Sequence, residues 1–201
     1  MHERMQSIHL PGGSMIFFNE EILSHSSEKV NTKIESEKNM IIRLASVEDI
    51  CDILDIYEGA RAFMREVGNP NQWTGKYPDE ETILSDIEKE KLYVCTENED
   101  ILAVFYYNVG IDPTYLKIYD GAWVNDKPYG VIHRIAVSDR ARGKGVAKVC
   151  FDFAYDKCGN VRIDTHRDNI PMQRALEKNG FTRCGIIYLA NGDERIAYQR
   201  V

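Results

Sequence analysis

Residues 131–147 read Val-Ile-His-Arg-Ile-Ala-Val-Ser-Asp-Arg-Ala-Arg-Gly-Lys-Gly-Val-Ala. The seven apolar-rich residues at the start of this stretch predict a strand, and a helical pattern begins where the glycines end. A strand, a short basic glycine loop and a helix start together present consecutive backbone N–H groups to an anion. Gly143 and Gly145 have no Cβ, so a phosphate can approach the main chain closely, and Arg142 and Lys144 add positive charge. The stretch therefore predicts a site for a phosphorylated ligand.

Other interpretations of this loop stay open at this point. Two glycines before a helix are often only a tight connection between two elements. A dinucleotide-binding fold has a glycine directly after the strand and a small residue at its third glycine position. Here residues 138–141 intervene and Lys148 takes the third position, although Asp164 follows at roughly the 20 residues expected of a ribose-binding acid. The Gly-x-x-x-x-Gly-Lys-Ser/Thr loop of NTPases is absent from the sequence.

The loop resembles the acetyl-CoA signature of the GNAT superfamily of N-acetyltransferases. That signature is Arg or Gln, two residues, Gly, one residue, and Gly or Ala, and residues 140–145 match it. Residues 169–181 resemble the second motif of the superfamily, which ends Glu-Lys-x-Gly-Phe, here at 177–181. From 44 to 201 the expected elements also follow the GNAT order. Two motifs in the right order favour the superfamily but do not select the acceptor.

Composition narrows the class of protein. The 201 residues suit one domain of about 100–200 residues, and 43% hydrophobic with 28% charged residues is typical of a globular enzyme. The net charge of −7 argues against a nucleic-acid partner and suits a cationic acceptor such as an amine. Five cysteines without a Cys-x-x-Cys pair predict a reducing compartment and no metal cluster. No apolar run approaches the ~18 residues of a membrane span and no secretory signal is recognised, so we expect no membrane partner and a cytoplasmic location.

Residues 1–39 differ from the rest of the chain. Residues 24–39 are polar, rich in Ser, Glu and Lys, and have little apolar surface to bury, which predicts a flexible N-terminal extension. We expect the acetyltransferase domain to span residues 40–201.

Hydrophobic periodicity and turn residues predict the elements of this domain. Strands are expected at 40–45, 92–96, 101–108, 131–137, 161–165, 182–189 and 194–199. A first helix is expected after Ser46, which with Asp49 forms a predicted N-terminal cap. Further helices are expected at about 80–90, from 146 and from about 170. In the helix at 80–90, Ile83, Leu84 and Ile87 are expected to face inward. A strand, a helix and a strand at 131–165 imply one parallel pair in a mostly antiparallel sheet. This is the GNAT layout, an α/β fold of the α+β type with helices on both faces of a twisted sheet, in which the parallel pair splays apart around the pantetheine arm.

The resemblance implies acetyl-CoA as the acyl donor, with no metal. It implies that the end of the strand bonds the pantetheine through its backbone and that the loop holds the pyrophosphate. The strand residues are Ile135, Ala136 and Val137, and the loop residues are Arg140, Arg142, Gly143, Lys144, Gly145, Val146 and Ala147. Asn169 matches the asparagine of the second motif beside the cofactor arm, and by position it is also a candidate helix N-cap.

The reaction that the resemblance implies is direct attack of a deprotonated amine on the thioester. A tyrosine before the Glu-Lys-x-Gly-Phe run often protonates the leaving thiolate in this superfamily, but this chain has Leu176 there. His133 and His166, on neighbouring predicted strands, are the candidates for proton transfer because histidine titrates near neutral pH. Each is also compatible with a hydrogen-bonded structural role. Trp73, in a loop of polar and helix-breaking residues, is the candidate for contact with the acceptor.

We therefore expect this protein to transfer an acetyl group from acetyl-CoA to a primary amine of a small molecule or to an exposed amino group. The alternative is a non-catalytic acyl-CoA-binding sensor or regulatory module that has kept the loop and lost turnover. Antibiotics, polyamines, amino acids and peptide N-termini are all acceptors that the sequence leaves open. It leaves the oligomeric state open as well, a homodimer being one option.

Overall fold

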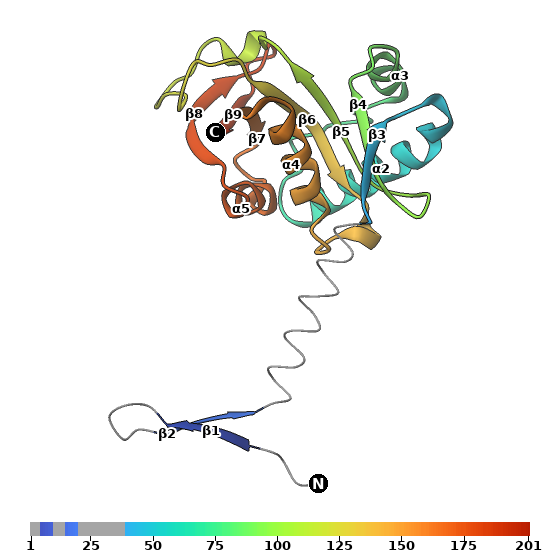
Figure 1. Ribbon diagram of the computed structural model, residues 1–201. Coiled ribbons are helices and arrows are strands. Elements are labelled where there is room, and N and C mark those ends of the chain that lie inside the picture. Colours follow the sequence, from blue (N-terminus) through green and yellow to red (C-terminus); the bar gives the residue numbers. More distant parts are fainter. Residues whose placement is uncertain (1–4, 10–14, 20–38) are drawn as a thin grey trace. The chain divides into compact units, whose positions relative to one another are not determined.

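The computed structural model describes residues 5–9, 15–19 and 39–201 (Figure 1). Contacts between Cα atoms divide the chain into two units, Met1–Asn39 and Met40–Val201. In the first unit, β1 (Met5–His9) and β2 (Met15–Asn19) form an antiparallel hairpin, which the sequence analysis did not anticipate. The polar stretch at 20–38 lies outside the described residues, so the flexibility expected of the extension stays a prediction.

The second unit is built on one seven-stranded sheet in the order β3-β4-β5-β6-β7-β9-β8. The strands are β3 (Ile41–Leu44), β4 (Leu92–Glu97), β5 (Asp100–Val109), β6 (Gly130–Val137), β7 (Val161–Thr165), β8 (Thr182–Tyr188) and β9 (Glu194–Arg200). The helices are α2 (Ile50–Glu66), α3 (Glu80–Glu88), α4 (Val146–Cys158) and α5 (Ile170–Lys178), with short 3-10 turns η1 (Val47–Asp49), η2 (Pro113–Tyr115) and η3 (Asp139–Ala141). The predicted strands and helices are confirmed to within about two residues at their ends.

The start of α2 follows the predicted cap with one difference. The Ser46 backbone N–H donates to Asp49 Oδ2 at 2.8 Å, as a capping residue three positions away should. The chain first makes the 3-10 turn η1, however, and the α-helix begins only at Ile50. In α3 the expectation for Leu84 was wrong: Ile83 is buried but Leu84 is exposed, because the inward face of this helix is completed by Asp86 instead.

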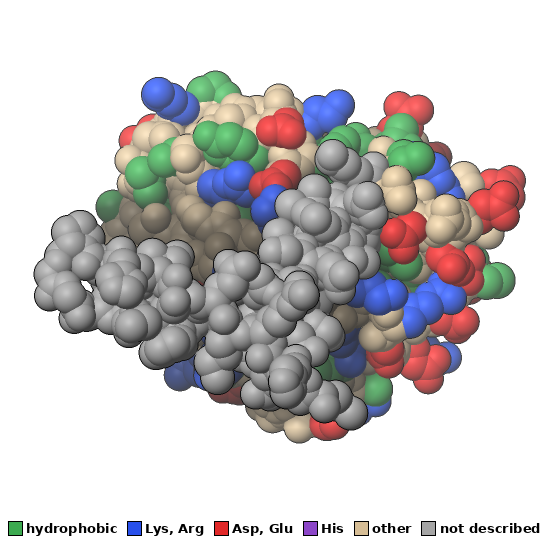
Figure 2. Space-filling model, turned by 60° about the horizontal axis from the view of Figure 1, so that its bottom comes forward, with side chains coloured by type: hydrophobic (Ala, Val, Ile, Leu, Met, Phe, Trp, Pro, Cys, Tyr) green, Lys and Arg blue, Asp and Glu red, His purple; other side chains and the backbone are tan. Residues whose placement is uncertain are grey.

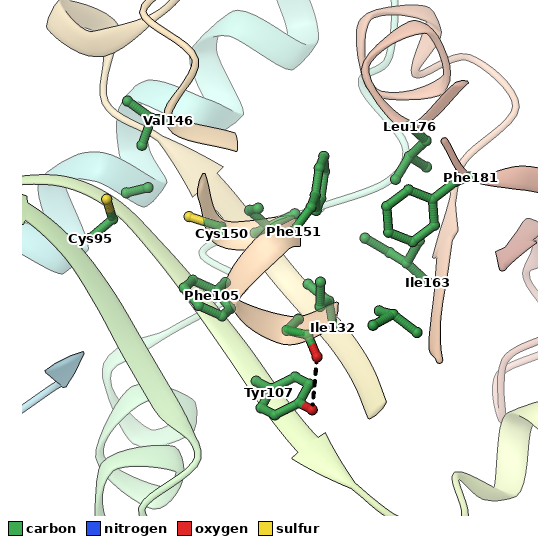
Figure 3. Close-up of a cluster of buried hydrophobic side chains, with 14 of the residues drawn as sticks. Cys95, Phe105, Tyr107, Ile132, Val146, Cys150, Phe151, Ile163, Leu176 and Phe181 are labelled. Carbon is green, nitrogen blue, oxygen red and sulfur yellow. Dashed lines mark hydrogen bonds between the residues drawn. The ribbon is translucent and has the colours of Figure 1, made fainter. Parts of the chain in front are cut away.

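Helices cover both faces of the sheet, as predicted. α2 and α3 pack with β4 and β5 in one apolar cluster, represented by Ile53 and Ile83 against Val94. α4 and α5 contribute to a second cluster on the other face, drawn in Figure 3. There, Phe151 of α4 lies edge-on to Phe181 with ring centroids 5.2 Å apart. The sheet is therefore buried on both sides along its central strands.

The Tyr107 hydroxyl lies at one edge of the second cluster and forms a hydrogen bond there. The Tyr107 hydroxyl donates to the Ala154 carbonyl oxygen at 3.2 Å, the bond dashed in Figure 3. Burial raises the pKa of Tyr107 to about 12, so the hydroxyl keeps its proton and remains a donor at physiological pH. This bond fixes the last turns of α4 on β5.

The parallel pair of β6 and β7 is short and then opens. Only three residue pairs align, from Gly130 with Val161 to Ile132 with Ile163. β6 runs on to Val137 and β7 to Thr165, so the two strands separate beyond Ile132. The predicted splay is confirmed, and it opens a gap in the middle of the sheet.

A β-bulge at Arg134 accompanies the separation. His133 pairs with Tyr106 and Ala136 with Val104, so Phe105 alone faces two residues of β6. Arg134 has a φ of 51°, a left-handed conformation that a non-glycine side chain rarely adopts. The sequence analysis missed this bulge, because no glycine marks it.

Three side chains hold Arg134 in this conformation. The Tyr57 hydroxyl of α2 donates to the Arg134 carbonyl oxygen at 2.9 Å. The Arg134 guanidinium reaches Asp86 of α3 at 2.5 Å and the Tyr77 hydroxyl at 3.3 Å. The two helices on one face of the sheet thus determine where β6 bends.

The surface of the described residues carries both signs of charge. Figure 2 shows acidic and basic side chains interspersed on one face, in keeping with 25 Lys and Arg against 32 Asp and Glu in the sequence. Among the described residues, no helix is long and apolar enough to cross a membrane.

We predict that Phe151→Ala lowers the free energy of unfolding by about 3–5 kcal/mol, because the side chain is fully buried and its removal leaves a cavity. Ile111→Ala is the control, since Ile111 is exposed and such surface changes stay within about 0.5 kcal/mol. Urea unfolding followed by circular dichroism measures both. Equal effects of the two substitutions would contradict the assignment of this core.

Candidate functional site

A cavity of about 610 Å³ occupies the gap between β6 and β7. Its walls come from the segment between α2 and α3, from the separating ends of the two strands, from the start of α5 and from the turn between β8 and β9. The residues that line it include Gln72, Trp73, Asp112, His133, Ile135, Asp164, Asn169 and Arg195. The sequence analysis named four of them as residues of an acetyltransferase site, His133, Ile135, Asn169 and Trp73, and the structure brings all four to one cavity.

His133 projects from β6 just where the strands part. Its Nε2 lies 2.8 Å from Asp112 Oδ2, and its Nδ1 lies 3.7 Å from Asp164 Oδ1. About 23% of the His133 side chain is exposed, so it is reachable from the cavity yet held in place. Asp112 comes from the loop after β5 and Asp164 from β7, so the imidazole lies between two carboxylates from different elements.

Asp112 is held ionised beneath the imidazole. Burial alone would raise its pKa, but the hydrogen bonds from His133 and Thr114 outweigh this and lower the pKa of Asp112 to about 2. The Thr114 backbone N–H and hydroxyl both bind Asp112 Oδ1, at 2.8 and 2.5 Å. Since a carboxylate only accepts hydrogen bonds, the contact requires a proton on His133 Nε2. In the neutral imidazole, Nδ1 therefore carries the free lone pair.

Asp164 links the imidazole to a second group of polar side chains. Its Oδ1 accepts from the buried Tyr115 hydroxyl at 2.7 Å, and its Oδ2 lies 3.9 Å from Arg195 Nε. Burial and the neighbouring charge of Asp164 raise the pKa of Tyr115 well above its ordinary value, so this hydroxyl stays a donor. Asp164 itself was considered in the sequence analysis only as a ribose-binding acid, and its place here differs from that interpretation.

Asn169 performs the capping role that its position suggested. Its Oδ1 accepts from the Met172 backbone N–H at 3.1 Å, which caps α5. Its Nδ2 donates to Gln72 Oε1 at 2.8 Å, and Asn69 Nδ2 donates to the same oxygen at 2.9 Å. The amide of Asn169 thus also ties the segment before α3 to the start of α5.

Trp73 forms part of the cavity wall beside Tyr57. The two rings meet edge to face with centroids 5.5 Å apart, and Trp73 packs against the α2 and α3 cluster. It is therefore a partly buried wall residue that also faces the cavity.

His166 does not line the cavity. Its Nδ1 accepts from the Asp168 backbone N–H at 3.2 Å. Burial, together with the charge of Arg195, lowers the pKa of His166. Of the two histidines chosen from sequence, the structure brings only His133 to the gap between the strands.

The glycine loop adopts the geometry of an anion site at the start of α4. Gly143 and Gly145 have φ values of 79° and 88°, and Gly145 is the N-cap of this 13-residue helix. A Cβ at Gly143 would meet no atom within 4 Å, so its φ rather than crowding favours glycine there. The Arg142 and Lys144 backbone N–H groups donate to the Asp139 and Ala141 carbonyl oxygens within the loop. The groups that suit an anion are therefore the N–H groups of the first turn of α4, at the positive end of the helix.

The basic side chains of the loop differ in their partners. Arg142 pairs with Asp139 and stacks on Phe63, with its guanidinium carbon 3.9 Å from the ring centroid. Arg140 lies 3.3 Å from Asp100 in an exposed pair. Lys144 is exposed and forms no ion pair with any described residue. Lys144 is thus the loop cation whose charge is least compensated by the protein.

The backbone residues expected to bind the pantetheine divide between two environments. Ile135 lines the cavity, whereas Ala136 and Val137 pair with Val104 and Ala103 of β5. Leu176, at the position of the usual tyrosine, is fully buried in the α4 and α5 cluster and offers no group for proton transfer.

Sequence reasoning missed Asp112, Tyr115 and Arg195 as site residues. The first had a usable signal, since Asp-Pro-Thr at 112–114 is typical of a capped turn, and the Asp112 side chain does cap η2. The other two had none, because their partners are far away in the sequence.

Comparisons with known proteins agree with this geometry. Residues 53–181 match the model of the acetyltransferase (GNAT) family. No curated protein sequence matches the chain.

Three solved structures are similar to this chain. A GNAT family acetyltransferase from Streptococcus agalactiae is 34% identical, with a TM-score of 0.74 over 81% of this chain and 95% of that chain. A putative acetyltransferase from Staphylococcus aureus is 26% identical, with a TM-score of 0.58 over 80% of this chain and 97% of that one. A chain of the NatC complex bound to Gag peptide and CoA shares the fold at 16% identity, with a TM-score of 0.52 over 81% of this chain and 98% of that chain.

The lowered pKa of Asp112 predicts an acid-dependent loss of stability. As the pH falls from 6 to 3, the unfolded carboxyl takes up a proton before the folded one, so the wild type should lose about 1 kcal/mol more unfolding free energy than Asp112→Asn. Urea unfolding at a series of pH values measures this difference. Asp156→Asn, an exposed change on α4, serves as the control and should follow the wild type. Parallel curves for the wild type and Asp112→Asn would refute the stabilising role.

Proposed function

We propose that this chain, which belongs to the acetyltransferase (GNAT) family, transfers an acetyl group from acetyl-CoA to a primary amine. The observation that carries the proposal is the opening of β6 and β7 beyond Ile132, with His133 at the opening and the glycine loop directly after β6. A donor held by that loop can extend into the gap and meet an amine beside the imidazole.

The glycine loop supports binding of the CoA pyrophosphate. The backbone from Arg142 to Ala147 and the positive end of α4 suit an anion. Lys144 adds a charge without a protein ion-pair partner among the described residues. Acetyl-CoA enters as the donor substrate and leaves as CoA.

The reaction needs an amine with a free lone pair. An ammonium that arrives in the cavity gives its proton to His133 Nδ1, the nitrogen whose lone pair is free while Nε2 donates to Asp112. The amine nitrogen then bonds to the thioester carbonyl carbon, the carbon–sulfur bond breaks, and the electron pair leaves with the CoA thiolate. The nitrogen loses its second proton through water to that thiolate, which departs as the CoA thiol. Backbone N–H groups at the gap stabilise the negative charge that develops on the carbonyl oxygen.

The two carboxylates around His133 support its role as the base. A proton on Nδ1 makes the ring cationic, and the ring then lies between Asp112 at 2.8 Å and Asp164 at 3.7 Å. Asp112 also fixes the orientation of the ring, as the carboxylate of a catalytic triad does.

The leaving thiolate has no side-chain acid at the usual position, because Leu176 is buried in the core. Water can protonate it, since a thiol with a pKa of ~8.5 is a good leaving group near neutral pH. Free cysteines at all five positions support a cytoplasmic location, where thiols stay reduced.

Acetyl-CoA should stabilise the protein against thermal unfolding. At 100 times its dissociation constant it adds about 2.7 kcal/mol, and NAD should add nothing. Lys144→Glu should weaken acetyl-CoA binding, because it places a negative charge beside the pyrophosphate. The matched control is Lys157→Glu at the opposite end of α4. Equal acetyl-CoA affinities for both variants in calorimetry would reject the loop as the donor site.

His133→Gln should lower kcat for amine acetylation by about 10²–10⁴-fold, the usual contribution of a general base. Acetyl-CoA affinity should stay close to that of the wild type, because the imidazole lies in the cavity rather than in the loop. His166→Gln is the control and should keep wild-type kcat. Release of CoA thiol in the presence of an amine panel measures turnover. Binding of acetyl-CoA without turnover of any amine would favour the sensor interpretation and overturn the enzymatic proposal.

A further inference from the structure

Arg195 places a positive charge in the wall of the cavity. It lies near the start of β9, and only 6% of its side chain is exposed. Its Nη1 donates to the Glu194 carbonyl oxygen at 3.0 Å. The nearest carboxylate oxygens belong to Asp164 at 3.9 Å and Asp193 at 3.6 Å, both beyond hydrogen-bond distance. These acids compensate part of its charge but accept no hydrogen bond from it.

Three other buried or half-buried arginines each have an acceptor at 2.7 Å or closer, although Arg134 Nε and Arg162 Nε have no hydrogen-bond partner among the described residues. Arg134 reaches Asp86 at 2.5 Å, and Arg200 reaches Asp152 at 2.7 Å. Arg162 is buried between the rings of Trp123 and Tyr129 and donates to a backbone carbonyl at 2.7 Å. Arg195 has one backbone acceptor, at 3.0 Å, and no carboxylate oxygen of the described residues within 3.5 Å, so its remaining N–H groups gain little for the water that they lose. We therefore expect a bound ligand to accept hydrogen bonds from the Arg195 guanidinium.

The negatively charged Asp164 lies next to Arg195 in the same cavity. Asp164 faces both Arg195, through Oδ2, and His133 Nδ1, through Oδ1. One carboxylate thus separates the base from the guanidinium, so both lie within reach of a single small molecule. A guanidinium pairs best with a planar carboxylate, which it can bind through two parallel N–H groups.

We infer that the acceptor is a free amino acid, whose amine lies against His133 and whose carboxylate binds the Arg195 guanidinium. This inference rests on the proposed function and names its substrate class. Asp112 and Asp164 attract the ammonium end, and Arg195 attracts the carboxylate end, so the zwitterion is oriented with its nitrogen at the base. A peptide N-terminus lacks the anionic group, because its first carboxyl is an amide. A simple alkylamine lacks it as well.

The experiment compares acceptors that differ only in this group. The full chain and acetyl-CoA are tested with the twenty standard amino acids, and then with the carboxamide and the decarboxylated amine of the best one. Removing the carboxylate should lower kcat/KM by about 100-fold, as loss of a buried charge pair does. Equal rates for the three acceptors, or turnover of amides and amines without any amino acid, would overturn the inference and leave the proposed function intact. No turnover of any amine would reject the proposed function itself.

Variants test the residue directly. Arg195→Gln should raise KM for the amino acid by about 100-fold and change kcat/KM for the decarboxylated amine by less than about threefold. Arg200→Gln, on the same strand but paired with Asp152, is the matched control and should leave both acceptors unchanged. An equal loss with both acceptors would assign Arg195 a structural role only. If thermal unfolding shows that Arg195→Gln does not fold, the comparison of acceptors with the wild-type protein decides the question.

Discussion

The early end of the pairing between β6 and β7 is the constraint on which the site depends. Two parallel strands would normally continue their hydrogen bonds to their ends, but here the register stops at Ile132. The bulge at Arg134 bends β6 away, and Tyr57 and Asp86 hold it there from α2 and α3. The helices that bury one face of the sheet therefore also determine that the gap exists. A left-handed arginine costs roughly 1–3 kcal/mol and persists because these contacts fix it.

Sequence analysis predicted the elements and the glycine loop before α4 because their signals are local. The glycines of the loop, the Asn169 cap and the alternating strands each depend on residues a few positions apart. The GNAT resemblance rests on the same local motifs, and the separation of the two parallel strands was predicted from that resemblance. The bulge escaped because Arg134 has no local feature of a left-handed residue. Leu84 was predicted to face inward because it is apolar. The inward face of α3 instead includes Asp86, which pairs with Arg134, a residue far away in the sequence.

The acceptor side of the cavity could not be predicted, because its contacts join distant residues. Asp112 and His133 are 21 positions apart, Tyr115 and Asp164 are 49, and Gln72 and Asn169 are 97. No periodicity or spacing connects such pairs, and each becomes visible only when the sheet has brought the elements together. His166 was chosen from its position near the end of a predicted strand. It directly follows β7, but its Nδ1 accepts a hydrogen bond from the Asp168 backbone N–H in its own loop.

Donor and acceptor recognition thus follow different physical rules in this fold. In the proposed function, the donor is held by backbone N–H groups and a helix end, which many sequences supply provided that glycine occupies the left-handed positions. The acceptor is read by side chains, so a single buried charge changes what can bind. Arg195 at one end, and His133 with Asp112 at the other, place charges of both signs in the cavity wall, and Asp164 lies between them, 3.9 Å from Arg195 Nε and 3.7 Å from His133 Nδ1. A zwitterion satisfies both ends at once, whereas an uncharged amide leaves the guanidinium without its acceptor. With the proposed acceptor, the charge arrangement rather than the volume of the cavity therefore limits what this site can use.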